Sequence, residues 1–461
     1  MPCQLSLNQL SEIINPVGLK QKGENWDQIA TGITTDSRSL KPGEIFVALR
    51  GEKFDGHEFV GKAVGSGAIA VIAGKDYHLD LGTSVLCFLV DDPLEAYQQI
   101  ARWWRDRFDI PVIGITGSVG KTTTKELIAA VLATQGKVLK SQANYNNEIG
   151  VPKTLLELDA DCDFAVVEMA MRARGEIALL TQIARPTIGV ITNVGTAHIG
   201  RLGSEEAIAQ AKCELLAEMS EENVAILNHD NQRLLTTAAT IWQGKTLTYG
   251  LEGGDIQGKI LNQEMLQVGG INLPLPLPGR HNALNYLAAL AVAKVLNIDW
   301  NQLTTGLSVN LPGGRSRRYN LANDIVVLDE TYNAGTESTI AALHLLKETP
   351  GKRHIAVLGT MKELGAMSAE LHQKVGETAE KLNLEAIFLL IDDPEAKAIA
   401  TGAQNIPCEG YTTHEEMTAR LKDFVQPGDR LLFKASNSVR LDRVVEQFCS
   451  QLKLTNQHPE N

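Results

Sequence analysis

The chain has 461 residues, 44% hydrophobic and 21% charged, with a formal net charge of −12. This length is too great for one hydrophobic core and predicts roughly three domains. The negative charge, with no basic tail, argues against a nucleic acid or an anionic membrane surface as partner.

Cysteine usage and the N-terminal segment indicate the compartment. The six cysteines, at positions 3, 87, 162, 213, 408 and 449, lie far apart, and no two have metal-ligand spacing. They are typical of reduced thiols in a cytosolic enzyme. The N-terminal MPCQLSLNQL has no basic region followed by an apolar core, and no apolar run is long enough to span a bilayer. We therefore expect a cytoplasmic protein without a membrane span.

The first part of the chain predicts an α/β domain. Short apolar strands are expected at 45–49, 68–72 and 85–90, followed by a helix with Asp92 as N-cap and Pro93 as its first residue. Trp103 and Trp104 could suggest base stacking, but Trp104 falls on the apolar stripe of this helix, which favours packing. The stripe consists of Leu94, Tyr97, Ala101, Trp104 and Phe108. A boundary near 107–111 gives a first domain of residues 1–108.

From Pro111 onward strands alternate with helices, which predicts a parallel sheet covered by helices. Strands are expected at 112–116, 164–167 and 187–192, a helix at 122–134, and a β-rich hairpin insertion at 245–278 that turns at Gly269-Gly270. A boundary at the Gly- and Arg-rich 311–318 gives a central domain of residues 109–314. Residues 315–461 form another β/α series, predicted to be Rossmann-like but without G-x-G-x-x-G, so nicotinamide binding is not indicated.

The clearest motif is TGSVGKTT, between the predicted strand 112–116 and the helix that follows. Glycines in such a turn let backbone N–H groups surround phosphate oxygens, and the helix dipole adds positive potential. Lys121 is expected to reach the β- and γ-phosphates and the Thr122 hydroxyl to bind Mg²⁺. The whole loop is the predicted ATP site: Thr116, Gly117, Ser118, Val119, Gly120, Lys121, Thr122 and Thr123.

Two further side chains follow neighbouring strands. Glu168 ends the strand at 164–167, and His198 comes a few residues after the strand at 187–192. Ligands of parallel α/β sheets bind at these carboxyl ends, so both are candidate metal ligands beside the phosphates. Lys212 lies on a helix with Ser204 as N-cap, and from composition alone it is a solvated surface lysine.

Together these motifs resemble the Mur ligases of peptidoglycan synthesis, over nearly the whole chain. TGSVGKTT matches the family's form of the loop, which accounts for Ile115 where the general P-loop pattern has glycine. NYNNEIGVP resembles the segment characteristic of the dipeptide-adding member, whereas the DNP-R segment of the diaminopimelate- or lysine-adding member is absent. The remaining matches follow in the family's order: VVEMAMRARGEI, ITNVGTAHIGRLGS, AIAQAKCELL, GRHNALNYLAAL, GGRSRR, LDETYNAGTES, LGTMKELG and LLFKASNSVRLDRVV.

The resemblance implies roles for individual residues. Lys121 and Thr122 would serve ATP and a first Mg²⁺, with Glu168 as a second ligand of that ion. His198 would hold a second Mg²⁺ together with Lys212 as a carbamate. Asn282 would contact adenine, Arg315 the γ-phosphate, and Asp329 with Glu330 the ribose. The substrate side is implied for Asp36, Ser37 and Arg38, near the uridine diphosphate, and for Asn144, Asn146 and Asn147, near the muramoyl-peptide. Thr360 stands where the family often has aspartate.

The implied reaction is ATP-dependent amide formation between UDP-N-acetylmuramoyl-tripeptide and D-alanyl-D-alanine through an acyl phosphate, by a monomeric enzyme. The catalytic set would be Lys121, Glu168, His198, Lys212 and Arg315. Two alternatives stay open at this stage. One is another Mur-type ligase, adding lysine or diaminopimelate or extending a polyglutamate chain, and the other is a P-loop nucleotide switch.

Overall fold

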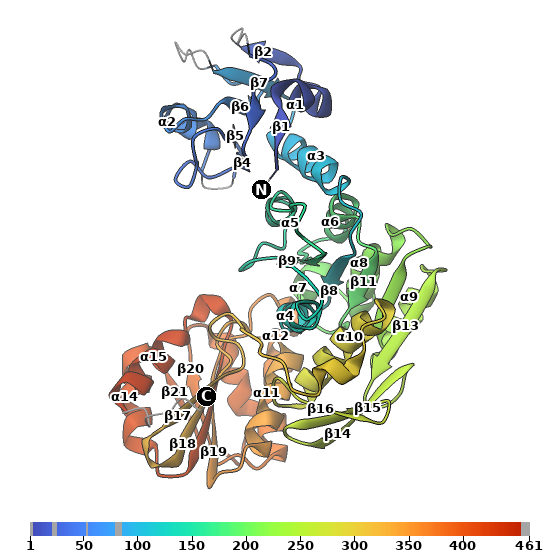
Figure 1. Cartoon of the computed structure of the whole chain (residues 1–461). Helices are drawn as coiled ribbons and strands as arrows, with labels where there is room; N and C mark the ends of the chain where they lie inside the picture. The colour runs from blue at the N-terminus through green and yellow to red at the C-terminus, as the bar shows by residue number, and fades with distance from the viewer. Residues whose placement is uncertain (1–2, 21–24, 52–53, 79–84, 453–461) are drawn as a thin grey trace.

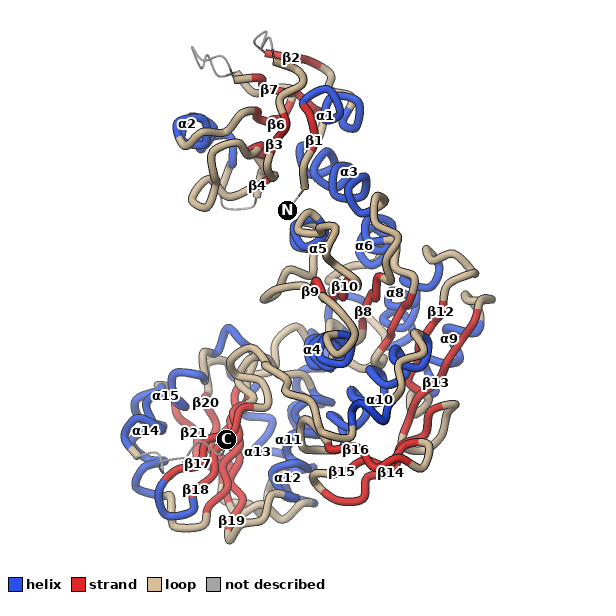
Figure 2. The backbone as a smooth tube through the Cα atoms, in the orientation of Figure 1, coloured by secondary structure: helices blue, strands red, loops and turns tan. Residues whose placement is uncertain are grey.

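The computed structural model describes residues 3–20, 25–51, 54–78 and 85–452, and Figure 1 shows three α/β units that follow one another along the chain. Each unit has its own sheet, and Figure 2 shows helices on the faces of the central and C-terminal sheets. The fold is therefore of the α/β class, as predicted. No helix within the described ranges is long and apolar enough to cross a membrane.

The N-terminal unit is built on a five-stranded sheet in which, among the described residues, the edge strand β2 pairs antiparallel with β7 and the other neighbours pair in parallel. A two-stranded pair, β1 with β3, lies apart from it. The strand order is β2 (Gly18–Lys20), β7 (Leu86–Val90), β6 (Ala70–Gly74), β5 (Ile45–Val47) and β4 (Ile33–Thr34), and the pair is β1 (Leu5–Ser6) and β3 (Ile29–Ala30). The helices are α1 (Leu7–Ile14), α2 (Val60–Gly65) and α3 (Pro93–Arg105).

The central unit has a nine-stranded sheet, parallel from β9 to β14 and antiparallel where β15 and β16 complete it. The order is β16 (Ile271–Pro274), β15 (Met265–Val268), β14 (Ile256–Asn262), β13 (Lys245–Gly250), β12 (Val224–Asn228), β11 (Ile188–Ile191), β8 (Val112–Thr116), β10 (Phe164–Glu168) and β9 (Val138–Lys140). Its helices are α4 (Lys121–Leu132), α5 (Gly150–Leu155), α6 (Glu176–Ala184), α7 (Ile199–Leu202), α8 (Glu205–Ala217), α9 (Gln232–Ala239) and α10 (Arg280–Val295). The hairpin expected at Gly269-Gly270 is confirmed as the β15–β16 turn.

The C-terminal unit has a six-stranded sheet, with β17 antiparallel at one edge. The order is β17 (Arg317–Leu321), β18 (Ile325–Asp329), β22 (Asp429–Lys434), β19 (Arg353–Gly359), β20 (Ala386–Leu390) and β21 (Cys408–Tyr411). The helices are α11 (Thr336–Glu348), α12 (Ser368–Lys381), α13 (Ala398–Gly402), α14 (His414–Phe424) and α15 (Asp442–Gln451). A 3-10 turn at Asn437–Val439 comes shortly before the last helix.

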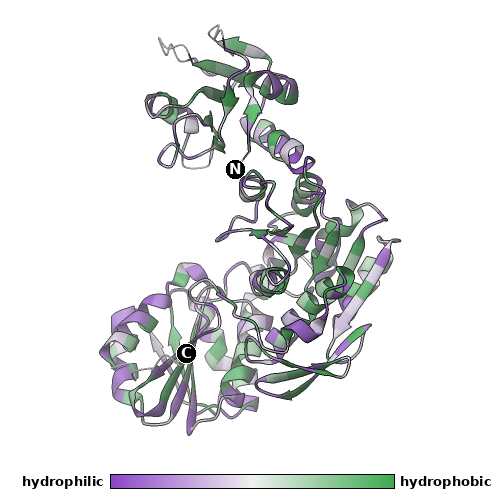
Figure 3. Cartoon of the chain, in the orientation of Figure 1, coloured by the Kyte–Doolittle hydropathy of each residue, from purple (hydrophilic) through white to green (hydrophobic). Residues whose placement is uncertain are grey.

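Burial is nearly continuous along the central strands, as expected of a sheet covered on both faces. Figure 3 shows apolar residues concentrated along the strands and polar residues on the outer helix faces. In the parallel centre, Ile113, Val166 and Val190 are fully buried in the cluster that packs against α4 and α10. Strands buried on both faces in this way are typical of parallel sheets, and they hold the strand ends in fixed positions.

Helix α3 joins the first unit to the central one. Its predicted N-cap is confirmed, since the Asp92 carboxylate accepts the Leu94 N–H at 2.8 Å. The packing role expected for Trp104 is also confirmed, because its ring lies edge-on to Phe108 and its Nε1 donates to the Leu158 carbonyl at 3.0 Å. Helix α3 packs against α5 and α6 of the central unit.

The buried Arg105 at the end of α3 holds this junction. Its guanidinium donates to the carbonyls of Phe108 at 2.7 Å, Ala184 at 2.9 Å and Arg185 at 3.1 Å. Arg105→Met should therefore lower the free energy of unfolding by about 2 kcal/mol, because these carbonyls lose charged donors at a buried site. Urea denaturation measures the change, with the exposed Arg102→Met on the same helix as control. Equal unfolding midpoints for the two variants would contradict this role.

Candidate functional site

The phosphate loop joins β8 to α4 and requires its glycines. Gly117 and Gly120 have φ angles of +152° and +83°, and a Cβ on Gly117 would lie 1.9 Å from the Thr192 Oγ1. Only glycine fits a site so close to a neighbouring side chain. Helix α4 begins at Lys121, so the loop runs directly into the N–H groups of its first turn. This geometry is typical of an anion site at a helix N-terminus.

Lys121 bends back over the loop. Its Nζ donates to the Gly117 carbonyl at 2.7 Å and to the Ser118 carbonyl at 3.4 Å. Desolvation lowers its pKa, and the nearby Arg315 lowers it further, whereas Glu168 acts in the opposite direction. The two cations and the carboxylate thus lie within electrostatic range of one another. A polyanion such as a triphosphate would relieve the repulsion between the cations.

Residues after β11 hold the loop in shape. The Thr192 Oγ1 donates to the Val119 carbonyl at 2.6 Å, the Asn193 Oδ1 accepts the Val119 N–H at 3.0 Å, and the Ser118 Oγ accepts the Gly195 N–H at 2.9 Å. The sequence analysis missed Thr192 and Asn193 in this role. They lie 73 and 74 positions from Val119, and the parallel pairing of β8 with β11 brings them to the loop.

Glu168 ends β10 beside the loop and is almost wholly buried. Its Oε1 accepts the Asn146 Nδ2 at 2.8 Å, whereas Oε2 is buried without a hydrogen-bond partner and lies 3.8 Å from the Lys125 Nζ. Lys125 is also engaged by the Ser141 carbonyl at 2.7 Å and by Glu126 at 3.1 Å. A buried carboxylate oxygen without a hydrogen-bond donor suits a hard cation such as Mg²⁺.

His198 and Lys212 converge on the same region. His198 has a φ of +66° at the start of α7. Its pKa is lowered, mainly by burial and also by the charges of Lys121 and Lys212, whereas Glu363 acts in the opposite direction. Lys212 lies on α8, whose predicted N-cap Ser204 is confirmed. It was read as a surface lysine, but that reading is wrong: the side chain is 1% exposed. Burial and the nearby Lys121 lower its pKa well below the usual range.

The C-terminal unit contributes Arg315. Its guanidinium lies 3.8 Å from the centre of the Tyr332 ring, and its buried Nε has no hydrogen-bond partner. The carboxylates of Asp329 and Glu330 are used internally: Asp329 accepts the Thr331 Oγ1 at 2.6 Å, and Glu330 accepts the Ser316 N–H at 3.0 Å. Arg315 is therefore a side chain at this edge that is available to a bound nucleotide. A ribose contact for Asp329 and Glu330 remains a prediction.

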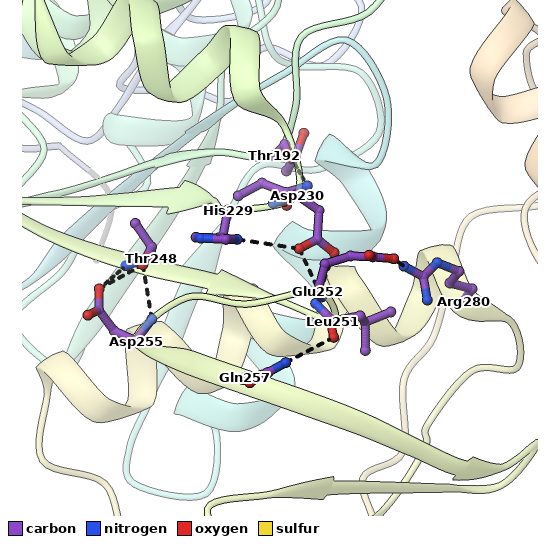
Figure 4. A network of polar contacts seen from close by, with 10 residues as sticks. Thr192, His229, Asp230, Thr248, Leu251, Glu252, Asp255, Gln257 and Arg280 are labelled. Carbon is purple, nitrogen blue, oxygen red and sulfur yellow. Dashed lines mark hydrogen bonds and ion pairs between the residues drawn. The ribbon is translucent and has the colours of Figure 1, made fainter.

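Asn282 lies in the first turn of α10, close to the loop. Its Nδ2 donates to the Pro278 carbonyl at 2.8 Å. The next turn carries Asn285, whose Oδ1 accepts the Thr124 Oγ1 of α4 at 3.2 Å. A polar network shown in Figure 4 holds the start of α10 to the β13–β14 turn: Arg280 pairs with Glu252 at 2.5 Å, and Asp230 accepts the Glu252 N–H at 3.0 Å.

The predicted substrate residues come from the first and the central units. The Arg38 guanidinium pairs with the Asp36 carboxylate at 2.7 Å. Hydrogen bonds from Arg38, and to a smaller extent the charge of Lys153 on α5, lower the pKa of Asp36 to about 2. Ser37, between them, is buried. Asn147, in the segment predicted to lie near the muramoyl-peptide, has a structural role, since its Oδ1 accepts the Gly150 N–H at 2.9 Å. The side chain of Asn144 is exposed.

The residues present fit a magnesium site completed by substrate oxygens. No group of three or more His, Cys, Asp or Glu side chains is arranged around one point for a metal ion within residues 3–452 as described. Thr122 is buried at the loop, and the Glu168 Oε2 accepts no hydrogen bond. Mg²⁺ commonly keeps several non-protein ligands and takes only one or two carboxylates.

Family models match each of the three units. They are described as "Mur ligase family, catalytic domain" at residues 30–102, "Mur ligase middle domain" at 115–293 and "Mur ligase, glutamate ligase domain" at 314–437.

Curated relatives match over nearly full length. The chain is 58% identical to the UDP-N-acetylmuramoyl-tripeptide–D-alanyl-D-alanine ligase of Synechocystis sp., covering 97% of this chain and 95% of the relative. It is 33% identical to the Escherichia coli ligase of the same name, covering 96% and 97%.

Solved structures agree. MurF from Acinetobacter baumannii superposes with a TM-score of 0.88 at 29% identity, covering 97% of this chain and 99% of the other. MurF from Thermotoga maritima in complex with ADP gives 0.81 at 32% identity, covering 90% and 96%. With its phosphate loop, its buried Glu168 and three matched domains, the chain belongs to the Mur ligase family.

Proposed function

We propose that this chain is an ATP-dependent ligase that joins D-alanyl-D-alanine to UDP-N-acetylmuramoyl-tripeptide, making the pentapeptide precursor of peptidoglycan in the cytoplasm. The observation that carries the proposal is a glycine-built phosphate loop whose Lys121 folds over it, beside a strand that ends in the buried Glu168, in a chain 58% identical to a ligase of that name. The Thermotoga neighbour holds ADP, which supports ATP as the energy source.

The chemistry is acyl activation. The terminal carboxylate of the tripeptide attacks the γ-phosphorus of ATP, ADP leaves, and an acyl phosphate forms. The amine of D-alanyl-D-alanine then attacks the carbonyl carbon, loses a proton, and phosphate leaves with one former carboxylate oxygen. Lys121 and Arg315 would neutralise charge on the transferred group, and the loop N–H groups would orient it.

Mg²⁺ would be held by Thr122 and Glu168, and a second ion by His198 with Lys212. Bound there, Mg²⁺ would neutralise developing charge on phosphate oxygens. Glu168 would also be held in place by Asn146, which donates to its Oε1 at 2.8 Å. This hydrogen bond links the substrate segment to the metal ligand, so substrate binding and ion binding would support each other.

A carbamate on Lys212 would make that side chain an anionic oxygen ligand. Carbon dioxide reacts with a neutral amine, and burial favours the neutral form because it lowers the Lys212 pKa. The described residues place no hydrogen-bond or ion-pair partner at this amine. If the carbamate is required, Lys212→Arg should lower the ligase rate as much as Lys212→Ala, by about 10²-fold or more. An active Lys212→Arg enzyme would show that the positive charge alone suffices.

Phosphate release tests the function. It should be slow with ATP alone and rise strongly only when UDP-N-acetylmuramoyl-tripeptide and D-alanyl-D-alanine are both present. Two further substrate pairs test the alternative Mur-type activities. Lysine or diaminopimelate with the UDP-N-acetylmuramoyl-dipeptide tests a lysine- or diaminopimelate-adding ligase. Glutamate with a polyglutamate acceptor tests a polyglutamate ligase. Release indifferent to every pair would favour a nucleotide switch and overturn the proposal.

A further inference from the structure

Residues 195–201, the histidine segment, lie between the phosphate loop and the C-terminal unit. On the loop side, the Ser118 Oγ accepts the Gly195 N–H at 2.9 Å. The segment carries His198 in a left-handed conformation at φ +66°. On its other side, two glutamates of the C-terminal unit contact it at separate points.

Glu337 makes the first contact, from the first turn of α11. Its Oε1 accepts the Thr196 N–H at 2.6 Å, and its Oε2 accepts the Thr196 Oγ1 at 3.2 Å. A Cβ on Gly195 would lie 2.6 Å from the Glu337 Oε1. The glycine therefore allows the carboxylate to reach a peptide group that is itself one residue from the Ser118 contact.

Glu363 makes the second contact. Its Oε2 lies 2.5 Å from the His198 Nδ1, and its Oε1 accepts the Arg201 NH2 at 3.0 Å. The backbones also meet: the Gly200 N–H donates to the Glu363 carbonyl at 3.1 Å. A Cβ on Gly365 would lie 2.7 Å from the Gly200 Cα. Such close backbone approach is specific to one relative position of the two units.

Glu363 is fixed to its own unit and cannot follow the central unit if the two separate. Met361 and Leu364, on either side of it, are 1% and 3% exposed. The Lys362 N–H donates to the Ser436 Oγ at 2.9 Å, and the Lys362 Nζ lies 3.1 Å from both Asp392 and Asp393. Opening of the C-terminal unit would therefore withdraw Glu363 from His198.

We propose that Glu337 and Glu363 are positioning residues that set the histidine segment, and with it His198, only when the C-terminal unit is closed on the phosphate loop. Closure would then act on the metal site through two carboxylates that contact the histidine segment. The role of His198 as a metal ligand rests on the proposed function. The coupling between the Glu337 contact and the Glu363 contact does not depend on that function.

Amide hydrogen exchange in the full chain without substrates tests the coupling. Glu337→Ala should raise exchange at the Gly200 amide, which Glu337 does not touch, by about tenfold. Glu363→Ala should raise exchange at the Thr196 amide by a similar factor. Glu370→Ala, at an exposed glutamate of the same unit, is the control and should match the wild type. Increases confined to the amide that each glutamate contacts would overturn the proposal.

Magnesium dependence gives a second readout. In Glu337→Ala and Glu363→Ala, the Mg²⁺ concentration for half-maximal rate should rise about tenfold, with a smaller fall in kcat at saturating Mg²⁺. Glu363→Gln keeps the size of the side chain and should give an intermediate shift at an unchanged melting temperature. Unchanged Mg²⁺ dependence in all three variants would contradict a positioning role. Because exchange is measured without turnover, failure of this inference is distinguishable from failure of the ligase assignment.

Discussion

Replacing Lys121 with methionine should lower the ligase rate on the order of 10³-fold, with little change in the melting temperature. The amine now donates to the loop carbonyls of Gly117 and Ser118, and it is expected to turn to the phosphates when ATP binds. Its charge is needed most when negative charge shifts during phosphoryl transfer, so kcat should fall more than ATP affinity. Steady-state kinetics in which ATP is varied and the other substrates are saturating measure both quantities.

Lys245→Met is the matched control for this loss of charge. Lys245 is an exposed lysine of the same unit, on β13. Its variant should keep the wild-type rate. A Lys121→Met enzyme within about tenfold of wild type would mean that the loop does not hold the transferred phosphate.

Glu168→Gln should lower the rate by about 10²- to 10³-fold and raise the Mg²⁺ concentration needed for half-maximal activity. The change is nearly isosteric and keeps the oxygen that accepts the Asn146 hydrogen bond. It removes the charge at Oε2, the buried atom without a hydrogen-bond partner. The two effects should therefore report the loss of a cation ligand rather than a packing defect.

Glu126→Gln separates this effect from general loss of buried charge. Glu126 is also buried and pairs with the same Lys125, and its other partner is Lys140. Its variant should be less stable, with an unchanged Mg²⁺ dependence. If both variants shift the Mg²⁺ requirement equally, Glu168 is not a specific ligand.

Local signals in the sequence predicted the regular elements well. Asp92 with Pro93 marked the start of α3, and the apolar runs at 112–116 and 164–167 marked β8 and β10, because caps and buried strands depend on adjacent residues. Strand β17, RRYNL, was missed because an edge strand with two exposed arginines has no apolar pattern. Its pairing with β18 supplies the hydrogen bonds instead.

The candidate site could be predicted only in its individual parts. Lys121, Glu168 and His198 were found because a motif or a strand end pointed to each of them. The environment of Lys212 was misjudged, because its burial depends on helices packing around it rather than on neighbours in sequence. Glu337 and Glu363 lie within two of the matched family segments, LDETYNAGTES and LGTMKELG. Their roles could not be predicted, because their partners, Thr196 and His198, lie 141 and 165 positions away.

Oxygen transfer from the tripeptide tests the central claim most directly. UDP-N-acetylmuramoyl-tripeptide labelled with ¹⁸O in its terminal carboxylate would be incubated with ATP, Mg²⁺ and D-alanyl-D-alanine, and the phosphate and peptide analysed by mass spectrometry. An acyl phosphate requires that each phosphate released carry one ¹⁸O and that the new amide keep the other. Unlabelled phosphate, with both labels retained in an unligated tripeptide, would contradict the assignment.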